Sequence, residues 1–339
     1  MDSTPARATA AADRTAAVRP RRPWLRAAGW AASVAILAAT TALLRDRMGA
    51  VGDAGGLPGV VPSSVAVVTY VIANLLLADT WWRVVALAGS SIGRGDAIWV
   101  WALSQLARYT LGAAQVGGRA VIGRRYGLTA TAGAVTTLVE IGWQTAITAL
   151  LVLATLPWWL PSSDDLRWLA VVGIVPAGAL VVGLVAPRTL LRLVASALEL
   201  GPLARLTGGR AVDVAERVRL DRGHAAAFTL RFALNTALRL VAFGALFLAV
   251  GGDLPTTGLL ALGAYAAGQL VGRIAVFAPG GIGPREGVTA LLLAPALGGG
   301  PALVLVAATR LLEVVGELAF FGIARFVRGR GARRAGSGR

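Results

Sequence analysis

The sequence predicts an all-α integral membrane protein, built as a polytopic helical bundle of about seven to eight membrane segments. Composition is the first reason: of 339 residues, 56% are hydrophobic and 15% are charged, and the mean hydropathy is +0.69. Length is the second, because several apolar runs reach the roughly 20 residues with which a helix crosses the hydrocarbon core. The third reason is the alternation of arginine-rich and arginine-poor connections between those runs.

The apolar runs divide the chain into one membrane domain with a tail at each end. Membrane segments are expected near Ala27–Leu44, Val60–Ala78, Leu128–Leu156, Trp168–Ala186, Ala225–Val250, Thr257–Phe277, Val288–Leu297 and Ala302–Ala324. Residues 23–328 are therefore predicted to form a single transmembrane domain. Within it, the loop 187–224 contains the amphipathic stretch Leu190–Leu200, which we expect to lie as a helix on the cytoplasmic surface. Residues 1–22 and 329–339 are predicted to be disordered, basic cytoplasmic tails.

The arginines indicate the topology. All 33 basic side chains are arginines, and they give the chain a formal net charge of +16. Most of them lie in the two tails, in residues 80–127 and in residues 187–224, whereas the alternate connections hold few arginines and several aspartates. This positive-inside pattern predicts a multi-pass protein of a bacterial inner (plasma) membrane with both termini in the cytoplasm. Because the charge reflects topology, nucleic acid is not an expected partner.

Missing residue types exclude several kinds of site. The chain has no cysteine, no lysine and a single histidine, His224. These absences exclude a disulfide framework, an HExxH zinc centre, a P-loop and a lysine Schiff base. We therefore expect no metal, no cofactor and no catalytic residues, in a protein that is not an enzyme.

The most informative stretch is Ala278–Gly287, which places a break rich in proline and glycine, and an Arg–Glu pair, between two apolar segments. Hydrocarbon offers no hydrogen bonds, so irregular backbone at this depth must be buried in protein or line a wet cavity. Ionisable side chains there are costly and mark a pathway or a site. Arg285 and Glu286 are therefore the first candidates for handling a substrate.

The two halves of the chain echo each other around this motif. Gln105 is followed after twelve residues by Gly117, and Gln269 is followed at the same interval by Gly281. Each match lies in an apolar segment that breaks at glycines and resumes with an arginine. Two re-entrant helical hairpins that enter from opposite faces, forming an inverted repeat with broken helices near the midplane, would explain the echo. The alternative for residues 257–299 is a pair of complete crossings, which leaves the topology unchanged.

Polar residues within the apolar segments form stripes at helical spacing. The stripes are Thr136, Glu140, Gln144 and Thr148; Arg231, Asn235 and Arg239; Tyr265, Gln269 and Arg273; and Arg310, Glu313 and Glu317. Residues three or four apart share one face of a helix. The residues of these stripes either pair with one another and hold neighbouring helices together, or they line a shared polar cavity. Polar contacts in membranes contribute well under about 2 kcal/mol each, which is little for so many costly groups, so the cavity is the preferred interpretation.

The charges of this interior favour an anionic ligand. One positive charge remains when the interior glutamates are set against the interior arginines. The residues counted are Arg231, Arg239, Arg273, Arg285 and Arg310 against Glu140, Glu286, Glu313 and Glu317. Arginine presents a planar fork that binds phosphate through two hydrogen bonds, and it keeps its proton when buried. Helices that begin after Gly118 and after Gly283 would add N–H donors, so an amphiphile with a phosphate headgroup fits this interior.

At these residues the sequence resembles the transmembrane region of lysylphosphatidylglycerol synthases. The motifs that carry the resemblance are Pro279–Glu286 with Ala308–Leu311, and earlier Gly117–Arg119 with Arg124–Leu128 and Glu140. The resemblance covers about Ala27 to Arg325. It implies a multi-helix domain that moves or handles a lipid, with flipping of aminoacylated phosphatidylglycerol as the best-known proposal for the family.

The sequence departs from the family pattern at two places. Leu111–Gln115 stands where the family usually has a Leu-Pro-Gly-like break, which weakens the prediction of the first hairpin. Ile141 follows Glu140 where the family usually has arginine, which weakens any role for Glu140. The chain also ends soon after its last helix, with no room for a soluble aminoacyltransferase domain, so we do not expect this polypeptide to lysylate lipids.

The sequence therefore predicts a flippase-like translocase of membrane lipids or lipid-linked substrates that recognises an anionic headgroup, on an anionic phospholipid or a polyprenyl-phosphate-type lipid, in an arginine-lined cavity. The predicted substrate-binding residues are Arg285, Glu286, Gly280, Gly281, Gly283, Arg273, Gln269, Arg310, Glu313, Arg231, Arg239, Arg119 and Glu140. The alternative is a non-transporting scaffold or accessory subunit for a cell-envelope glycosyltransferase or lipid-modifying enzyme, with the loop 187–224 as its contact surface. A membrane-embedded enzyme acting on pyrophosphate lipids is a third option, which no paired-aspartate metal motif supports.

Overall fold

The computed structural model describes residues 58–109, 114–160, 168–200, 204, 209–275 and 279–336. All the main elements within these ranges are helices, which confirms the predicted all-α class. In chain order they are α4 (Val60–Leu87), α5 (Arg94–Ala107), α6 (Ala114–Gly123), η2 (Arg124–Tyr126), α7 (Ala130–Ala154), α8 (Leu156–Trp159), α9 (Trp168–Val185), α10 (Pro187–Leu200), α12 (Ala211–Arg217), α13 (Arg222–Ala249), α14 (Leu254–Ile274), η5 (Pro279–Gly281), α15 (Pro284–Leu297) and α16 (Gly299–Gly336). The predicted tail 1–22 and the predicted segment Ala27–Leu44 lie outside the described residues.

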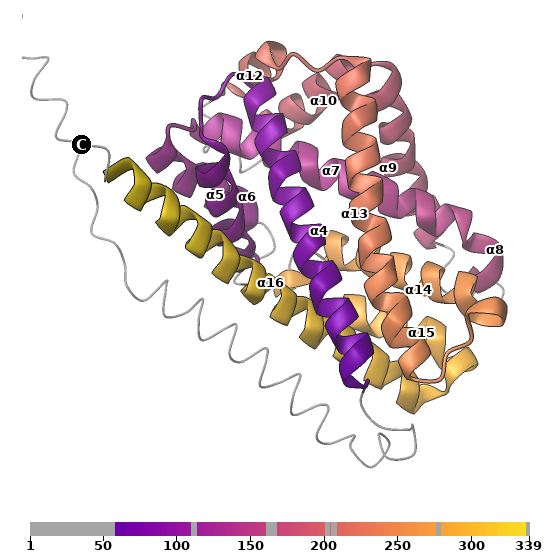
Figure 1. Cartoon of the computed structure of the whole chain (residues 1–339). Helices are drawn as coiled ribbons and strands as arrows, with labels where there is room; N and C mark the ends of the chain where they lie inside the picture. Colours follow the sequence, from indigo (N-terminus) through magenta and orange to yellow (C-terminus); the bar gives the residue numbers. More distant parts are fainter. Residues whose placement is uncertain are drawn as a thin grey trace, which may run out of the picture.

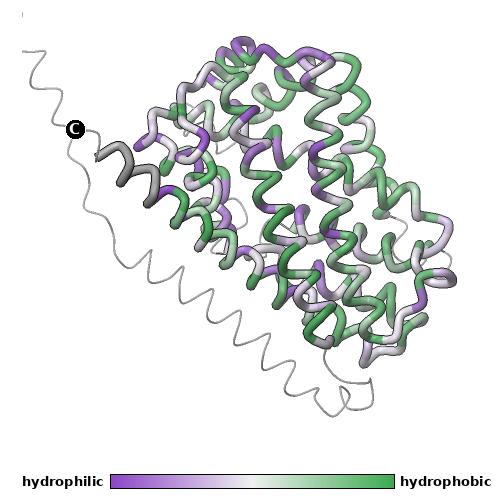
Figure 2. The backbone as a smooth tube through the Cα atoms, viewed as in Figure 1, coloured by the Kyte–Doolittle hydropathy of each residue, from purple (hydrophilic) through white to green (hydrophobic). Residues whose placement is uncertain are grey.

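Helices α4 and α13 lie side by side (Figure 1) and run antiparallel, because Arg231 of α13 bonds to Thr80 of α4 whereas Arg239, two turns later, bonds to Asn74. Helix α4 also packs against α5, α7 and α16. Among the described helices, α4, α7, α9 and α13 are long and apolar enough to cross a membrane. Figure 2 shows mainly hydrophobic helices, with hydrophilic turns gathered at the end of the bundle that holds α10 and α12.

Most predicted segments correspond to helices, and the largest differences are at helix ends. Helix α4 continues past the predicted end at Ala78 as far as Leu87, where the i, i+4 pair of Asp79 and Arg83 supports its last turns. Helix α16 continues to Gly336, whereas the sequence analysis assigns residues 329–339 to a disordered tail. Arginine and alanine, which are frequent there, are good helix formers. The total of seven to eight membrane segments stays a prediction.

Two helical hairpins enter the bundle from opposite ends. Helices α5 and α6 pack together and follow the end of α4, whereas α14 and α15 pack together and follow the end of α13. Because α4 and α13 are antiparallel, the hairpins point toward each other (Figure 1). Their tips touch, since the Gly280 N–H donates to the Arg108 carbonyl oxygen at 3.0 Å. At 14 residues, α5 is about 21 Å long, too short to cross the hydrocarbon, as expected for a re-entrant hairpin.

The first hairpin turns at a different place from the one that the internal echo suggests. Gly117 and Gly118 lie inside α6, which begins at Ala114, so no helix begins after Gly118 and that prediction is wrong. The glycines serve close packing instead. A Cβ on Gly118 would lie 3.4 Å from the Cβ of Ala107, and one on Gly133 of α7 would lie 3.1 Å from the Cα of Ala120. In the second hairpin α15 does begin directly after Gly283, as predicted.

The loop 187–224 folds against the bundle. Helix α10 covers the amphipathic stretch and packs on α9, α7 and α12. Its apolar face is covered by protein, because Leu191, Ala195 and Leu198 are buried in the same core as Trp81 of α4. The segment therefore caps one end of the bundle, and its expected position on a membrane surface stays a prediction.

Gly281→Ala is expected to destabilise the protein by about 1–3 kcal/mol. Gly281 has φ +74, which disfavours side chains, and its added Cβ would lie 2.8 Å from the Gly272 carbonyl oxygen, in backbone that cannot swing aside. Thermal unfolding in detergent measures the change. Gly287→Ala is the matched control in the same hairpin, because its Cβ would meet nothing within 4 Å. An equal melting temperature for the two variants would contradict the assigned tip packing.

Candidate functional site

A cluster of arginines converges on Glu313 of α16. The Glu313 carboxylate pairs with Arg239 of α13 at 2.9 Å, with Arg285 of α15 at 2.7 Å and with Arg310 of its own helix at 3.5 Å. Arg108, at the tip of the first hairpin, lies 3.9 Å away. The Glu313 side chain is 3% exposed, so one buried carboxylate holds together three helices and a hairpin tip.

Glu317, one turn further along α16, completes this Glu313 cluster on the side of the first hairpin. It forms an ion pair with Arg108 and accepts a hydrogen bond from the Tyr109 hydroxyl at 2.7 Å. The Tyr109 ring lies under the Arg310 guanidinium, with 5.3 Å between the Arg310 Cζ and the ring centroid. Glu317 is therefore the anchor of the first hairpin tip.

The second hairpin tip is held by Glu286 and Arg310. Glu286 accepts a hydrogen bond from the Gly283 N–H at 2.8 Å and so caps the start of α15. Arg310 donates to the Gly280 carbonyl oxygen at 3.4 Å, and its Nε lies 3.9 Å from the Glu286 carboxylate. The N–H of Gly283 is thus taken by the protein's own carboxylate.

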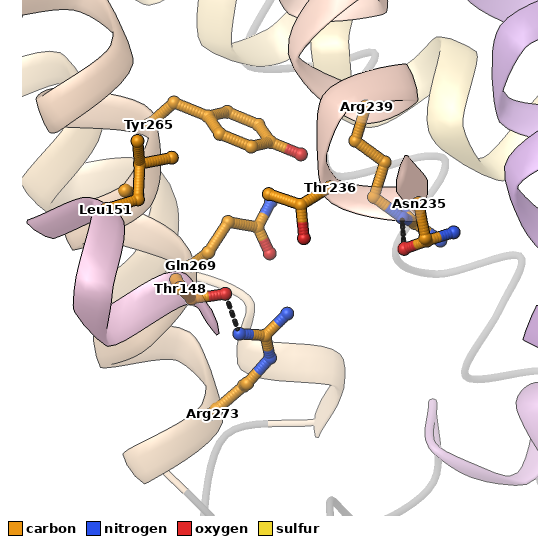
Figure 3. Close-up of a pocket in the computed structure, with 9 residues that line it drawn as sticks. Thr148, Leu151, Asn235, Thr236, Arg239, Tyr265, Gln269 and Arg273 are labelled. Atoms are coloured by element: carbon orange, nitrogen blue, oxygen red, sulfur yellow. Dashed lines mark hydrogen bonds between the residues drawn. The ribbon is translucent and has the colours of Figure 1, made fainter. Parts of the chain in front are cut away.

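Beside the Glu313 cluster lies a polar pocket between α7, α13 and α14 (Figure 3). The residues that line it are Thr148, Leu151, Asn235, Thr236, Arg239, Tyr265, Ala266, Gln269 and Arg273. Its cavity volume is about 10 Å³, room for about one water molecule. Gln269 connects the pocket to the cluster: with its amide oxygen turned to its donors, it accepts from Tyr265 at 3.0 Å and from the Arg285 Nη2 at 3.2 Å.

Arg273 differs from the other arginines of this region. Its guanidinium donates to the Thr148 hydroxyl, as Figure 3 shows, and to the Gln144 carbonyl oxygen at 3.2 Å. Within the described residues no carboxylate lies at ion-pair distance from it. A partly buried cation without a counter-charge is costly, so Arg273 is the position where an incoming anion would gain most.

Arg119 and Glu140 lie outside the Glu313 cluster and the polar pocket, where they form a fully buried ion pair. Both side chains are 0% exposed, and Arg119 binds the carboxylate with two nitrogens, at 2.5 and 3.2 Å. The indole of Trp101 and the amide of Gln144 also donate to Glu140, at 3.2 and 3.1 Å. This pair joins α6 to α7 and, unlike Arg239 and Arg273, does not line the polar pocket.

Arg231 is also separate from the Glu313 cluster. It pairs with Asp79 of α4 and donates to Thr80 at 2.8 Å, about 12 Å along α13 from Arg239. The predicted residues that do come together are Arg239, Arg273, Gln269, Gly280, Arg285, Glu286, Arg310 and Glu313, with Gly281 and Gly283 in the adjoining turn.

The charge balance of the interior differs from the predicted one. Arg231 and Glu140 leave the set and Arg108 joins it, so the Glu313 cluster and the polar pocket contain five arginines and three glutamates. Two positive charges remain instead of one. No group of histidine, cysteine or acidic residues arranged to hold a metal occurs among the described residues.

Comparison with known protein families agrees with this architecture. The family model described as the lysylphosphatidylglycerol synthase TM region matches residues 24–319. The chain belongs to this family. It is accordingly a multi-pass membrane protein related to lipid modification or transport. No curated protein and no solved structure matches the chain.

In this member of the lysylphosphatidylglycerol synthase TM-region family, sequence reasoning missed Arg108 and Tyr109. Counted with the cytoplasmic arginines, Arg108 is in fact deep in the bundle, because it ends the re-entrant helix α5. The predicted hairpin itself contained the signal: a residue at the end of a helix that enters about 21 Å from one face lies well inside the hydrocarbon core, which is about 30 Å thick.

Proposed function

We propose that the protein translocates a lipid or lipid-linked substrate by binding its anionic headgroup between the two hairpin tips, at the Glu313 cluster and the polar pocket. The observation that carries the proposal is the surplus of two positive charges in this interior, where Arg273 has no carboxylate partner among the residues that the structure describes. Buried charge is stable only when it is compensated. A phosphate headgroup supplies that compensation, and the guanidinium forks of Arg273, Arg239 and Arg285 suit it.

The two hairpins provide a route by which the headgroup reaches the site. Their tips meet in the interior from opposite ends of the bundle, so the site is approached by one hairpin from each side. A phosphate group needs more room than one water molecule, so binding requires the tips to separate. Among the described residues, the Gly280–Arg108 backbone bond joins the two tips, whereas the Arg108–Glu317 pair and the stacking of Tyr109 on Arg310 hold the first tip to α16. Alternate separation from either end is the way in which opposed repeats give access to a central site.

Arg273→Gln separates this proposal from a purely structural role. If Arg273 serves a ligand, removing an uncompensated cation leaves the melting temperature in neutral detergent unchanged or higher. Anionic lipid should then bind the polar pocket at least about tenfold more weakly than in the wild type. Lipid transfer between leaflets of proteoliposomes, followed with a fluorescent phosphatidylglycerol and a polyprenyl-phosphate analogue, should drop to the level of empty liposomes.

Leu151→Ala, a smaller change in the same pocket, is the control, because it removes no charge or hydrogen bond. A wild-type rate of transfer in Arg273→Gln, or a lower melting temperature with unaltered lipid binding, would refute the proposal. The scaffold alternative predicts the reverse pattern. There, deletion within residues 200–219 abolishes partner binding and Arg273→Gln does not.

A further inference from the structure

Three arginines meet on one carboxylate at the end of the bundle where α4 ends and α13 begins. Asp79 pairs with Arg83 at 3.0 Å, with Arg94 at 2.7 Å and with Arg231. Within the described part of the chain, Asp79 is the one carboxylate at ion-pair distance from these three guanidinium groups. The group is called the Asp79 cluster below, and it carries a formal surplus of two positive charges.

The surroundings of the Asp79 cluster add to its preference for an anion. Arg94 is the first residue of the 14-residue helix α5, where the helix dipole favours a negative group, and Asp96 of the same turn, which pairs with Arg328 at 3.2 Å, supplies one. Both Arg83 and Arg94 stack on Trp82, with 5.8 Å from each Cζ to the ring centroid. Their side chains are 50% and 61% exposed, so they remain accessible. Three guanidinium groups around one carboxylate, two of them accessible beside an indole, form a surface that attracts an anion.

A row of polar residues on one face of α13 extends from the Asp79 cluster to the polar pocket. From Arg231 the next polar residue on the same face of α13 is Asn235, which donates to the Ala73 carbonyl oxygen at 2.8 Å. Asn235 in turn accepts from Arg239 at 3.3 Å. Arg239 lines the pocket and also pairs with Glu313. The row therefore runs from the end of the bundle to its interior.

We propose that the Asp79 cluster binds the phosphate group of an anionic membrane lipid and is the first station of the headgroup on its way to the polar pocket. The binding of the phosphate group is inferred from the Asp79 cluster alone. The movement of the headgroup from there to the polar pocket rests on the proposed function. The lipid is favoured over dissolved phosphate because the site lies at the end of membrane-crossing helices, beside an indole of the kind that anchors at the headgroup level.

The double variant Arg83→Gln with Arg94→Gln tests the binding step. The protein is placed in phosphatidylcholine nanodiscs with increasing phosphatidylglycerol, and the phosphatidylglycerol that stays bound is measured by mass spectrometry. Each arginine near an anionic headgroup contributes about fivefold in affinity, so the double variant should bind about 25-fold more weakly. Arg124→Gln with Arg125→Gln, which removes the same charge from two exposed arginines outside the cluster, should lose less than about fivefold.

Several outcomes would overturn this inference. They are wild-type affinity in the double variant, an equal loss in the control, and displacement of the lipid by millimolar inorganic phosphate, which would make dissolved phosphate the ligand. Arg83→Lys with Arg94→Lys guards against a folding defect, because it keeps the charge and should keep most of the binding.

Failure of this inference and failure of the proposed function give different results. Arg273→Gln should keep phosphatidylglycerol at the Asp79 cluster and lose translocation. If the wild type translocates lipid while the double variant binds phosphatidylglycerol normally, the Asp79 cluster does not bind the headgroup, and the proposed translocase function is unaffected. If neither the wild type nor any variant translocates lipid while the double variant alone loses bound lipid, the Asp79 cluster is a lipid-binding site but the proposed movement to the polar pocket is wrong.

Discussion

Replacing Glu313 with glutamine is expected to lower the free energy of unfolding by about 3–5 kcal/mol. Its carboxylate is the shared partner of Arg239, Arg285 and Arg310 and is 3% exposed. A neutral amide leaves three largely buried guanidinium groups without that counter-charge, in a region that already has a positive surplus. The loss is measured by thermal or denaturant unfolding in mixed micelles, together with the yield of monodisperse protein.

Glu216→Gln is the control for this effect. Glu216 pairs with Arg192 at 3.6 Å, but the two side chains are 53% and 64% exposed. Exposed pairs contribute at most about 1 kcal/mol, so this variant should unfold like the wild type. Similar losses in the two variants would show that Glu313 is not the hub of the interior.

The Arg119–Glu140 pair should behave as a coupled unit. Arg119→Met alone and Glu140→Met alone should each cost about 3–5 kcal/mol, because each leaves one fully buried charge unpaired. The double variant should be more stable than either single variant, since it removes both charges. Its remaining cost, about 1–3 kcal/mol, comes from the Trp101 N–H, which loses its acceptor. A double-mutant cycle of unfolding free energies measures the coupling.

Additive losses in that cycle would contradict a closed ion pair. A second readout separates this pair from the candidate site. Because Arg119 and Glu140 lie outside the Glu313 cluster and the polar pocket, the double variant should keep most of its binding of anionic lipid. Loss of lipid binding at wild-type stability would return both residues to the predicted substrate-binding set.

Composition and helical spacing predicted the helices of this fold, because a membrane demands long apolar stretches and leaves few alternatives. The same spacing grouped Arg310 with Glu313 and placed Arg239 on a polar face, and both predictions agree with the contacts. Spacing cannot tell which face of one helix meets which face of another. The sequence analysis therefore placed Glu140 and Arg285 in one interior, although they belong to different clusters.

The predicted break at Gly117 illustrates a second limit. Glycine ends a helix in one context and lets two helices approach closely in another, and the choice depends on the neighbouring helix. Gly118 lies against Ala107 of α5, whereas Gly281 lies in a turn with φ +74. Asp79 was missed for a related reason: it was placed just beyond the predicted end of its helix, where it looked like a residue of the loop.

The contacts of the two hairpin tips determine how easily the tips separate. Among the described residues, the main-chain bond between Gly280 and Arg108 joins the two tips, and such a bond contributes only about 1 kcal/mol. The Arg108–Glu317 ion pair is the stronger contact of the first tip, and another anion can replace Glu317 in such a pair. If the protein carries a phosphate headgroup as we propose, that phosphate would compete with Glu317 for Arg108, so substrate binding itself would loosen the first hairpin tip from α16.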